Sequence, residues 1–338
     1  MTCYKIKVQS KEDLRKLISK TIKEQGNTCD LNFIDVSELT DLSFTFRNSE
    51  FNGNISDWDV SNVKKMNSMF DSSAFNGDIS NWNVSNVKDM SFMFFRSKFE
   101  EDLSHWNVSN VRNMAAMFAL SEFNGDISNW LTDKVKVMTR LFYGSSFNRS
   151  ISEWNVANVE NMAEMFTGTK FNSDISKWDV SKVKSMSGMF SHSIFNKEIS
   201  KWNVTKVEDM SYMFYDSNFN QDISLWDVSS VENMKGMFTR SVFNGDISHW
   251  IVANVKDMSG MFSYSEFNGD ISDWEICAID TSYMFRKSKF NGKLPDKWRF
   301  RVTRDMTGMF SGSAFKGDTN SKLVELSKLK YATDMFGE

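Results

Sequence analysis

The chain has 338 residues, more than a single globular core usually holds, so its length predicts either several domains or a repeat array. The formal net charge is -4, which argues against a nucleic-acid partner and against binding to an anionic membrane surface. One proline and 16 glycines exclude Pro-rich linkers and compositional disorder, and there is no run of about 18 apolar residues that would insert into a membrane.

The cysteines and the N-terminal residues bear on the compartment. Cys3, Cys29 and Cys277 are an odd set at unrelated positions, without the spacing of metal ligands. This is typical of reduced thiols rather than of a disulfide framework. The first residues, MTCYKIKVQSKEDLRK, contain no apolar signal core, and no lipoprotein-type signal precedes Cys3. As written, the chain is therefore expected to be cytoplasmic.

The first predicted element is an N-terminal cap over residues 1–30, made of a short strand and a helix. Ser10 is expected to be the helix N-cap, with Asp13 completing a capping box. Apolar residues then recur at helical spacing until a glycine ends the pattern, in the order Leu14, Leu17, Ile18, Ile22 and Gly26.

The rest of the chain is dominated by one repeat of 24 residues. All 11 tryptophans lie on this period, from Trp58 to Trp298, and methionine and phenylalanine rows follow the same spacing. The consensus is F-N-G-D-I-S-x-W-x-V-S-N-V-x-x-M-x-x-M-F-x-x-S-x. Self-similarity at this period predicts a solenoid, in which each unit buries its apolar stripe against the same stripe of its neighbour. We therefore expect the tryptophans to form a buried column.

The apolar spacing changes within one unit. The W-x-V centre at Trp58 and Val60 alternates like a strand, whereas Val63, Met66 and Met69 recur at helical spacing. The sequence therefore predicts an α/β solenoid of strand-turn-short-helix units, similar in plan to leucine-rich repeats.

Polar residues also form rows along the array. Asn and Ser recur at the turns, where short side chains satisfy backbone groups and can bond their neighbours along the stack. A column of aspartates, including Asp78, Asp126 and Asp174, raises calcium as an alternative. Each unit offers only one carboxylate where calcium needs several oxygens, so turn and helix capping is the preferred interpretation and no cofactor is expected.

The repeat signal weakens at both ends. The predicted solenoid covers residues 31–338, with a degenerate first unit at 31–50, about eleven units over 51–314 and a degenerate last unit at 315–338. The last unit has lost the Asn-Gly and Trp signals, so it caps the array weakly. End-to-end self-association is therefore an alternative to a monomeric array.

Units such as DISNWNVSNVKDMSFMF and DISKWDVSKVKSMSGMF resemble the repeats of the BspA-like leucine-rich-repeat surface proteins, including the mycoplasma-type lipoprotein repeats. The resemblance covers residues 31–336. It implies a right-handed solenoid, a role in adhesion or recognition of a host protein, and a cell-surface or secreted location. It brings no catalytic motif with it.

Three classes of function are considered for a repeat array of this kind. The first is a non-enzymatic protein-binding module, and the second is a structural or self-assembling scaffold. The third is an enzyme, which the sequence disfavours because no phosphate loop, G-x-S-x-G or H-E-x-x-H motif occurs. Two of the three histidines, His105 and His249, share a row but lie six repeats apart.

A binding face is predicted from side-chain alternation. If Trp58 and Val60 point inward, residues 57 and 59 point outward, and so do their equivalents in every unit, here called the 57-type and 59-type rows. Both rows vary, so we expect that the fold does not dictate them. Together they bring apolar and charged side chains to an otherwise polar surface, and the predicted partner-binding residues are Leu131, Lys177, Lys201, Leu225, Asp227, His249 and Ile251.

Overall fold

The computed structural model describes residues 5–316 and 333–337. The chain divides into two compact units, Met1–Val159 with Thr169–Ser173, and Glu160–Gly168 with Asp174–Glu338. They are called unit 1 and unit 2 below, and each is described by itself. Most of the predicted last repeat, 315–338, lies outside the described residues.

Unit 1 begins with the predicted cap. Strand β1 (Ile6–Lys7) pairs in parallel with β2 (Ile34–Asp35), and helix α1 (Lys11–Gln25) lies between them in the chain. The helix prediction is confirmed, because the Ser10 side chain accepts from the Asp13 backbone N–H and Gly26 follows the last turn with φ of 88°. Leu14 and Ile18 are buried, whereas Leu17 and Ile22 are only partly covered. None of the helices in the described residues could cross a membrane.

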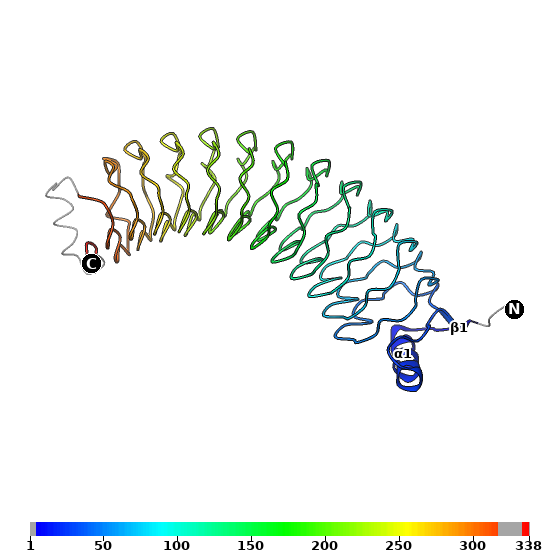
Figure 1. Ribbon diagram of the computed structural model, residues 1–338. Helices are drawn as coiled ribbons and strands as arrows, with labels where there is room; N and C mark the ends of the chain where they lie inside the picture. The colour runs from blue at the N-terminus through cyan, green and yellow to red at the C-terminus, as the bar shows by residue number, and fades with distance from the viewer. Residues whose placement is uncertain (1–4, 317–332, 338) are drawn as a thin grey trace. The chain divides into compact units, whose positions relative to one another are not determined.

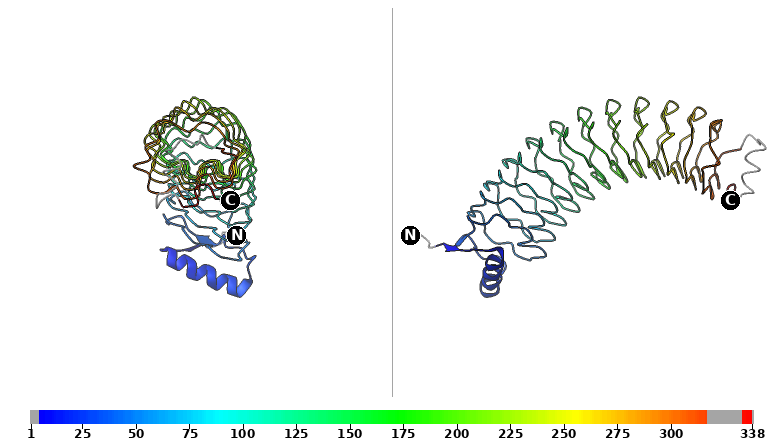
Figure 2. Two further views of the ribbon diagram at one scale, coloured as in Figure 1. Left: turned by 90° about the vertical axis from the view of Figure 1, so that its left-hand side faces the viewer. Right: turned by 180° about the vertical axis from the view of Figure 1, so that it is seen from behind.

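Polar contacts attach α1 to the first coil of unit 1. The Lys11 ammonium donates to Asp41 Oδ2 at 2.9 Å and to Ser43 Oγ at 2.8 Å. The Arg15 guanidinium donates to the carbonyls of Ser43 and Phe44. Figure 1 shows the helix beside the coils that follow it in the chain, and Figure 2 shows the same end from two other sides. The helix therefore covers the end of the stack with its own buried side chains and hydrogen bonds.

Within each unit, every repeat forms one coil, and successive coils stack (Figure 1). The tryptophan prediction is confirmed, since the exposed fraction of these side chains is between 1% at Trp274 and 6% at Trp298. Most of the indoles also have a polar role: Trp226 Nε1–H donates to the carbonyl of Ile199 in the preceding coil at 3.1 Å, whereas Trp298 Nε1 is buried without a partner. Equivalent bonds recur along both units. A buried aromatic side chain with one N–H can thus fill the core and satisfy a backbone carbonyl together.

The phenylalanine rows complete the core. In unit 2 the Phe238 ring stacks on Phe243, the first residue of the following repeat, with ring centroids 4.4 Å apart. It also stacks on Phe214 and Phe262 in the two adjacent coils, with centroids 5.7 Å away in each case. Because every ring contacts rings of both neighbours, burial is shared between coils rather than completed within one.

The predicted short helix is wrong. In the segment that begins at Met66, alternate N–H groups leave the coil: Met66 donates to Asp89 of the next coil at 2.9 Å and Ser68 donates to Ser91 at 2.9 Å. The intervening Met69 N–H bonds the Met66 carbonyl three residues back. Ser68 and Ser72 have φ of 54°, which a right-handed helix cannot contain. The segment is therefore a series of tight turns that brings residues three apart to the core, as a helix would.

The predicted strand was placed in the wrong part of the repeat. Trp58 N–H and Val63 N–H bond carbonyls three residues back, so the W-x-V segment lies between two tight turns and is not a strand. Isolated parallel bridges join neighbouring coils just before the first methionine instead, as in Lys65 with Asp89. Side-chain alternation nevertheless holds around Trp58, because its backbone neighbours 57 and 59 are exposed. The result is a solenoid-like array whose repeats consist mostly of non-regular structure.

The aspartate column caps turns, as predicted, although no helix follows it. Asp222 Oδ1 accepts the backbone N–H of Ser224, and Asp246 and Asp270 accept from the serine two residues on in the same way, each at 2.8–2.9 Å. A second ladder runs along the stack, where Asn244 N–H donates to Asn220 Oδ1 of the preceding coil at 2.9 Å. These bonds satisfy the turn backbone and link adjacent coils.

Acid should destabilise the fold through these aspartates. The backbone N–H and hydroxyl of the following serine hold the pKa of Asp222, Asp246 and Asp270 below the usual range. Because the folded pKa is depressed, this stabilisation is present above the unfolded value of about 3.9 and is lost as pH falls through the folded pKa. We expect the urea midpoint to fall between about pH 5 and about pH 3.

Asparagine at the same three positions supplies the control. The Asp222→Asn, Asp246→Asn, Asp270→Asn variant keeps an acceptor for each turn but has nothing to titrate there. Its urea midpoint at neutral pH should lie somewhat below that of the parent protein, because a neutral amide oxygen is a weaker acceptor than a carboxylate, and it should lose less on acidification. Parallel losses in the two proteins would show that the turn aspartates do not carry the acid response.

Candidate partner-binding surface

The outward rows lie where alternation places them. In unit 2, Trp226 and Val228 are 3% and 1% exposed, whereas Leu225 and Asp227 on either side of the tryptophan are exposed. The same inside-outside pattern places the rest of the predicted set at the surface: Leu131, Lys177, Lys201, His249 and Ile251. Leu131 belongs to unit 1 and the others to unit 2.

The expectation that the fold leaves both rows free is wrong for the 59-type row. Asp227 Oδ1 accepts the backbone N–H of Ser229 at 3.0 Å, and Asp179 accepts that of Ser181 in the same way. The serine hydroxyl and N–H lower the pKa of the Asp227 carboxyl. Asn or Asp at this position therefore caps the turn that follows the tryptophan, and Asp227 has a structural role.

Residues other than Asn or Asp in the 59-type row therefore mark coils in which this turn lacks its usual cap. Leu131 and Ile251 have no side-chain acceptor for the turn, and they leave 60% and 62% of their surface exposed. Leu225, in the 57-type row, is 83% exposed. At Leu131 the neighbouring Thr132 is buried and its hydroxyl donates to the Asn155 carbonyl at 2.8 Å, which supplies a different bond to the next coil.

A hollow in unit 2 brings part of the predicted set together. It has a volume of about 290 Å³, and its lining includes His249, Ile251, Asp273, Glu275 and Lys297. Lys177, Lys201, Leu225 and Asp227 do not line it. The hollow therefore combines an exposed aliphatic side chain, an imidazole and groups of both charges at the surface.

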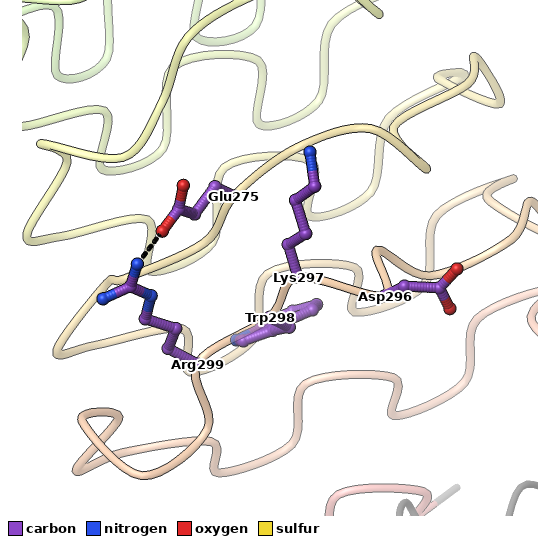
Figure 3. Close-up of a pocket in the computed structure, with 5 residues that line it drawn as sticks. All are labelled: Glu275, Asp296, Lys297, Trp298 and Arg299. Atoms are coloured by element: carbon purple, nitrogen blue, oxygen red, sulfur yellow. Dashed lines mark hydrogen bonds and ion pairs between the residues drawn. The ribbon is translucent and has the colours of Figure 1, made fainter.

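A second hollow of about 400 Å³ lies at the next coil and contains residues that the sequence reasoning missed. It is lined by Glu275, Asp296, Lys297, Trp298 and Arg299, and Figure 3 shows the ion pair between Glu275 and Arg299. Glu275 and Arg299 follow Ile251 in the 59-type row, so three successive coils lack the usual Asn or Asp. The same departure that identified Ile251 would have identified both charged residues.

The surface around Ile251 carries apolar, polar and charged side chains next to one another. Within residues 5–316 and 333–337, no three His, Cys, Asp or Glu side chains are grouped so that they could hold a metal ion. His249 lies in a hollow with Asp273 and Glu275. The free cysteine Cys277 has its Sγ 4.0 Å from Glu275 Oε1. The geometry offers hydrogen bonds, charge and apolar area.

Comparison with known proteins gives one result. The family model described as "Mycoplasma protein of unknown function, DUF285" matches four overlapping segments, residues 12–124, 95–170, 119–223 and 217–322. The chain belongs to the DUF285 family. No curated protein and no solved structure matches this DUF285 chain. The family match therefore establishes a DUF285 repeat array with an aromatic period of about 24 residues.

Proposed function

We propose that the protein is a non-enzymatic protein-binding module. Its contact surface is formed by Leu225, His249, Ile251, Glu275 and Lys297 of unit 2, called the variable face below. The observation that carries the proposal is Ile251, which is 62% exposed at a position where the turn favours Asn or Asp. Forgoing a capping side chain weakens the turn, so an aliphatic residue there needs a reason outside the fold.

The composition of the variable face supports a protein partner. Leu225 and Ile251 offer apolar area in neighbouring coils, and the hollow beside Ile251 is rimmed by Asp273, Glu275 and Lys297. An apolar centre with a charged rim is the usual anatomy of a protein–protein interface. In the 57-type row, Lys177 and Lys201 add exposed positive charge in the coils that precede Leu225.

The finer parts of the proposal rest on the resemblance. We propose that the array is right-handed and related to leucine-rich repeats, and that it serves adhesion or recognition of a host or partner protein at the cell surface. The alternative is a structural scaffold that self-associates through its ends. Light scattering over a range of concentrations separates the two, because only the scaffold grows in mass as concentration rises.

The variable face is tested by a triple change. Leu225→Asn, His249→Asn and Ile251→Asn together should not lower the unfolding midpoint, because all three side chains are exposed and Asn at position 251 restores the acceptor that caps the turn. Affinity for a partner identified by cross-linking should fall by about tenfold or more, as measured by surface plasmon resonance. Leu131→Asn, which removes an equally exposed aliphatic residue from unit 1, is the matched control. Unchanged affinity in the triple variant would remove the variable face from the proposal.

A further inference from the structure

A second cluster of exposed side chains lies on the turn segment of unit 2, in a different part of the repeat from the variable face. It consists of Arg240, Tyr264, Tyr283, Arg286 and Lys287, called the Tyr264 cluster below. Tyr264 and Tyr283 are 40% and 41% exposed. The cluster covers three successive coils, and the proposed function does not use any of its members.

Arg286 lies between two aromatic rings. Its guanidinium carbon is 5.3 Å from the ring centroid of Tyr283 in its own coil and 5.8 Å from that of Tyr264 in the preceding coil. The side chain is half-buried, and Nε is buried without a hydrogen-bond partner. Two rings therefore hold the guanidinium in place and shield part of it from water, while no carboxylate compensates its charge.

Two further cations approach the same ring. The Tyr264 centroid is 5.6 Å from the Arg240 guanidinium carbon of the preceding coil and 5.4 Å from the Lys287 ammonium of the following coil. Across the described residues, no ion pair joins Arg240, Arg286 or Lys287 to an acid. Three positive charges thus gather around one phenol ring, and none of them forms an ion pair among the described residues.

The three cations around Tyr264 are positioned to bind an oxyanion. Like charges repel, and a partly desolvated guanidinium gains most from a bidentate carboxylate or a similar planar acceptor. The rings that orient the cations reduce the entropy lost when a ligand binds. Cation–π contacts hold the cluster without an anion, so the site exists before the ligand arrives.

We infer that the Tyr264 cluster is a second docking surface, which binds an acidic segment of a partner protein. Tyrosine and arginine are the residue types that contribute most at protein interfaces, and the exposed ring edges provide apolar contact beside the charges. The positive charge is local, in a chain whose net charge is -4. A short segment with a few carboxylates fits that locality.

The test uses the full chain and defined probes. A fluorescent oligoglutamate peptide is titrated by anisotropy at low ionic strength, with an oligoglutamine peptide of equal length as the neutral probe. The Arg240→Gln, Arg286→Gln, Lys287→Gln variant should bind oligoglutamate about tenfold or more weakly than the parent protein. The control, Lys20→Gln, Lys98→Gln, Lys197→Gln, removes the same charge from exposed, scattered positions and should change the affinity less than about twofold.

Two single variants separate an organised cluster from mere positive charge. Tyr264→Leu keeps all three cations but removes the ring that collects them, so it should weaken oligoglutamate binding several-fold. Tyr264→Phe keeps the ring and should bind as the parent protein does. Equal losses in the cluster variant and the scattered control would overturn the inference. Binding of heparin without binding of oligoglutamate would also overturn it, in favour of a sulfated polysaccharide.

Discussion

Replacing Trp226 by alanine is expected to lower the free energy of unfolding by about 3–5 kcal/mol. The indole is 3% exposed, and its ring centroid is 6.4 Å from that of Phe214 in the preceding coil. The change removes a large buried side chain and also leaves the Ile199 carbonyl without the indole N–H. Urea unfolding followed by circular dichroism measures the loss. Because coils stabilise one another, neighbouring repeats should lose amide protection together with this one.

Two further variants show how much of the expected loss of stability comes from the indole N–H and how much from burial of the ring. Trp226→Phe keeps an aromatic ring but loses the N–H donor, so it should cost about 0.5–1.5 kcal/mol for the lost hydrogen bond plus the smaller volume, because the Ile199 carbonyl keeps the Trp202 N–H. Leu225→Ala changes the adjacent exposed residue and should stay within about 0.5 kcal/mol of the parent protein. If Trp226→Ala proved no worse than Leu225→Ala, the buried position of the tryptophan column would be refuted.

Gly53→Ala should be the most damaging small substitution in unit 1. A Cβ on Gly53 would lie 2.0 Å from the Cys29 carbonyl oxygen, which belongs to the backbone joining the cap to the first coil. That carbonyl also accepts the Asn54 N–H at 3.2 Å, so it cannot move away without losing the bond. We expect a loss of about 3 kcal/mol in urea unfolding, since overpacking against backbone has no flexible side chain to absorb it.

Gly245→Ala is the matched control in unit 2. There the added Cβ would meet the Phe243 ring edge at 2.9 Å, while the nearest backbone atom, the Gln221 carbonyl oxygen, stays 3.9 Å away. The equivalent position one repeat earlier is Gln221, so this row accepts a side chain. The control should therefore cost clearly less than Gly53→Ala. Equal costs would mean that the cap junction is not special and that glycine serves the whole row alike.

Much of the surface and the core follows from the repeat alone. The period of 24 residues and the tryptophan row predict a stacked aromatic core, and burial confirms it from Trp58 to Trp298. The local signals at Ser10 and Gly26 predict the ends of α1, because a helix cap depends on neighbouring residues only. Alternation about the tryptophan also places Leu225, His249 and Ile251 at the surface.

The backbone conformation could not be predicted in the same way. Apolar residues three and four apart, such as Met66, Met69 and Phe70, satisfy the pattern of a helix. They satisfy a row of tight turns equally well, because both structures return a side chain to the same face after about three residues. The two structures differ in which carbonyls accept the backbone N–H groups of the segment. In this protein alternate N–H groups donate to carbonyls of the next coil.

The need for tertiary structure also explains why the expectation that the fold leaves the 59-type row unconstrained is wrong. Variation between Asn and Asp was interpreted as a lack of constraint, whereas both residues supply the Oδ1 that caps the turn at Asp227 and its equivalents. Sequence by itself determined the period, the buried rows, the cap helix and the outward rows, because each depends on spacing along one chain. Tertiary structure decided which backbone groups bond across coils, which side chains enclose the hollows near Ile251 and how the cations gather at Tyr264. These features arise between coils that are 24 residues apart, where no local pattern specifies the geometry.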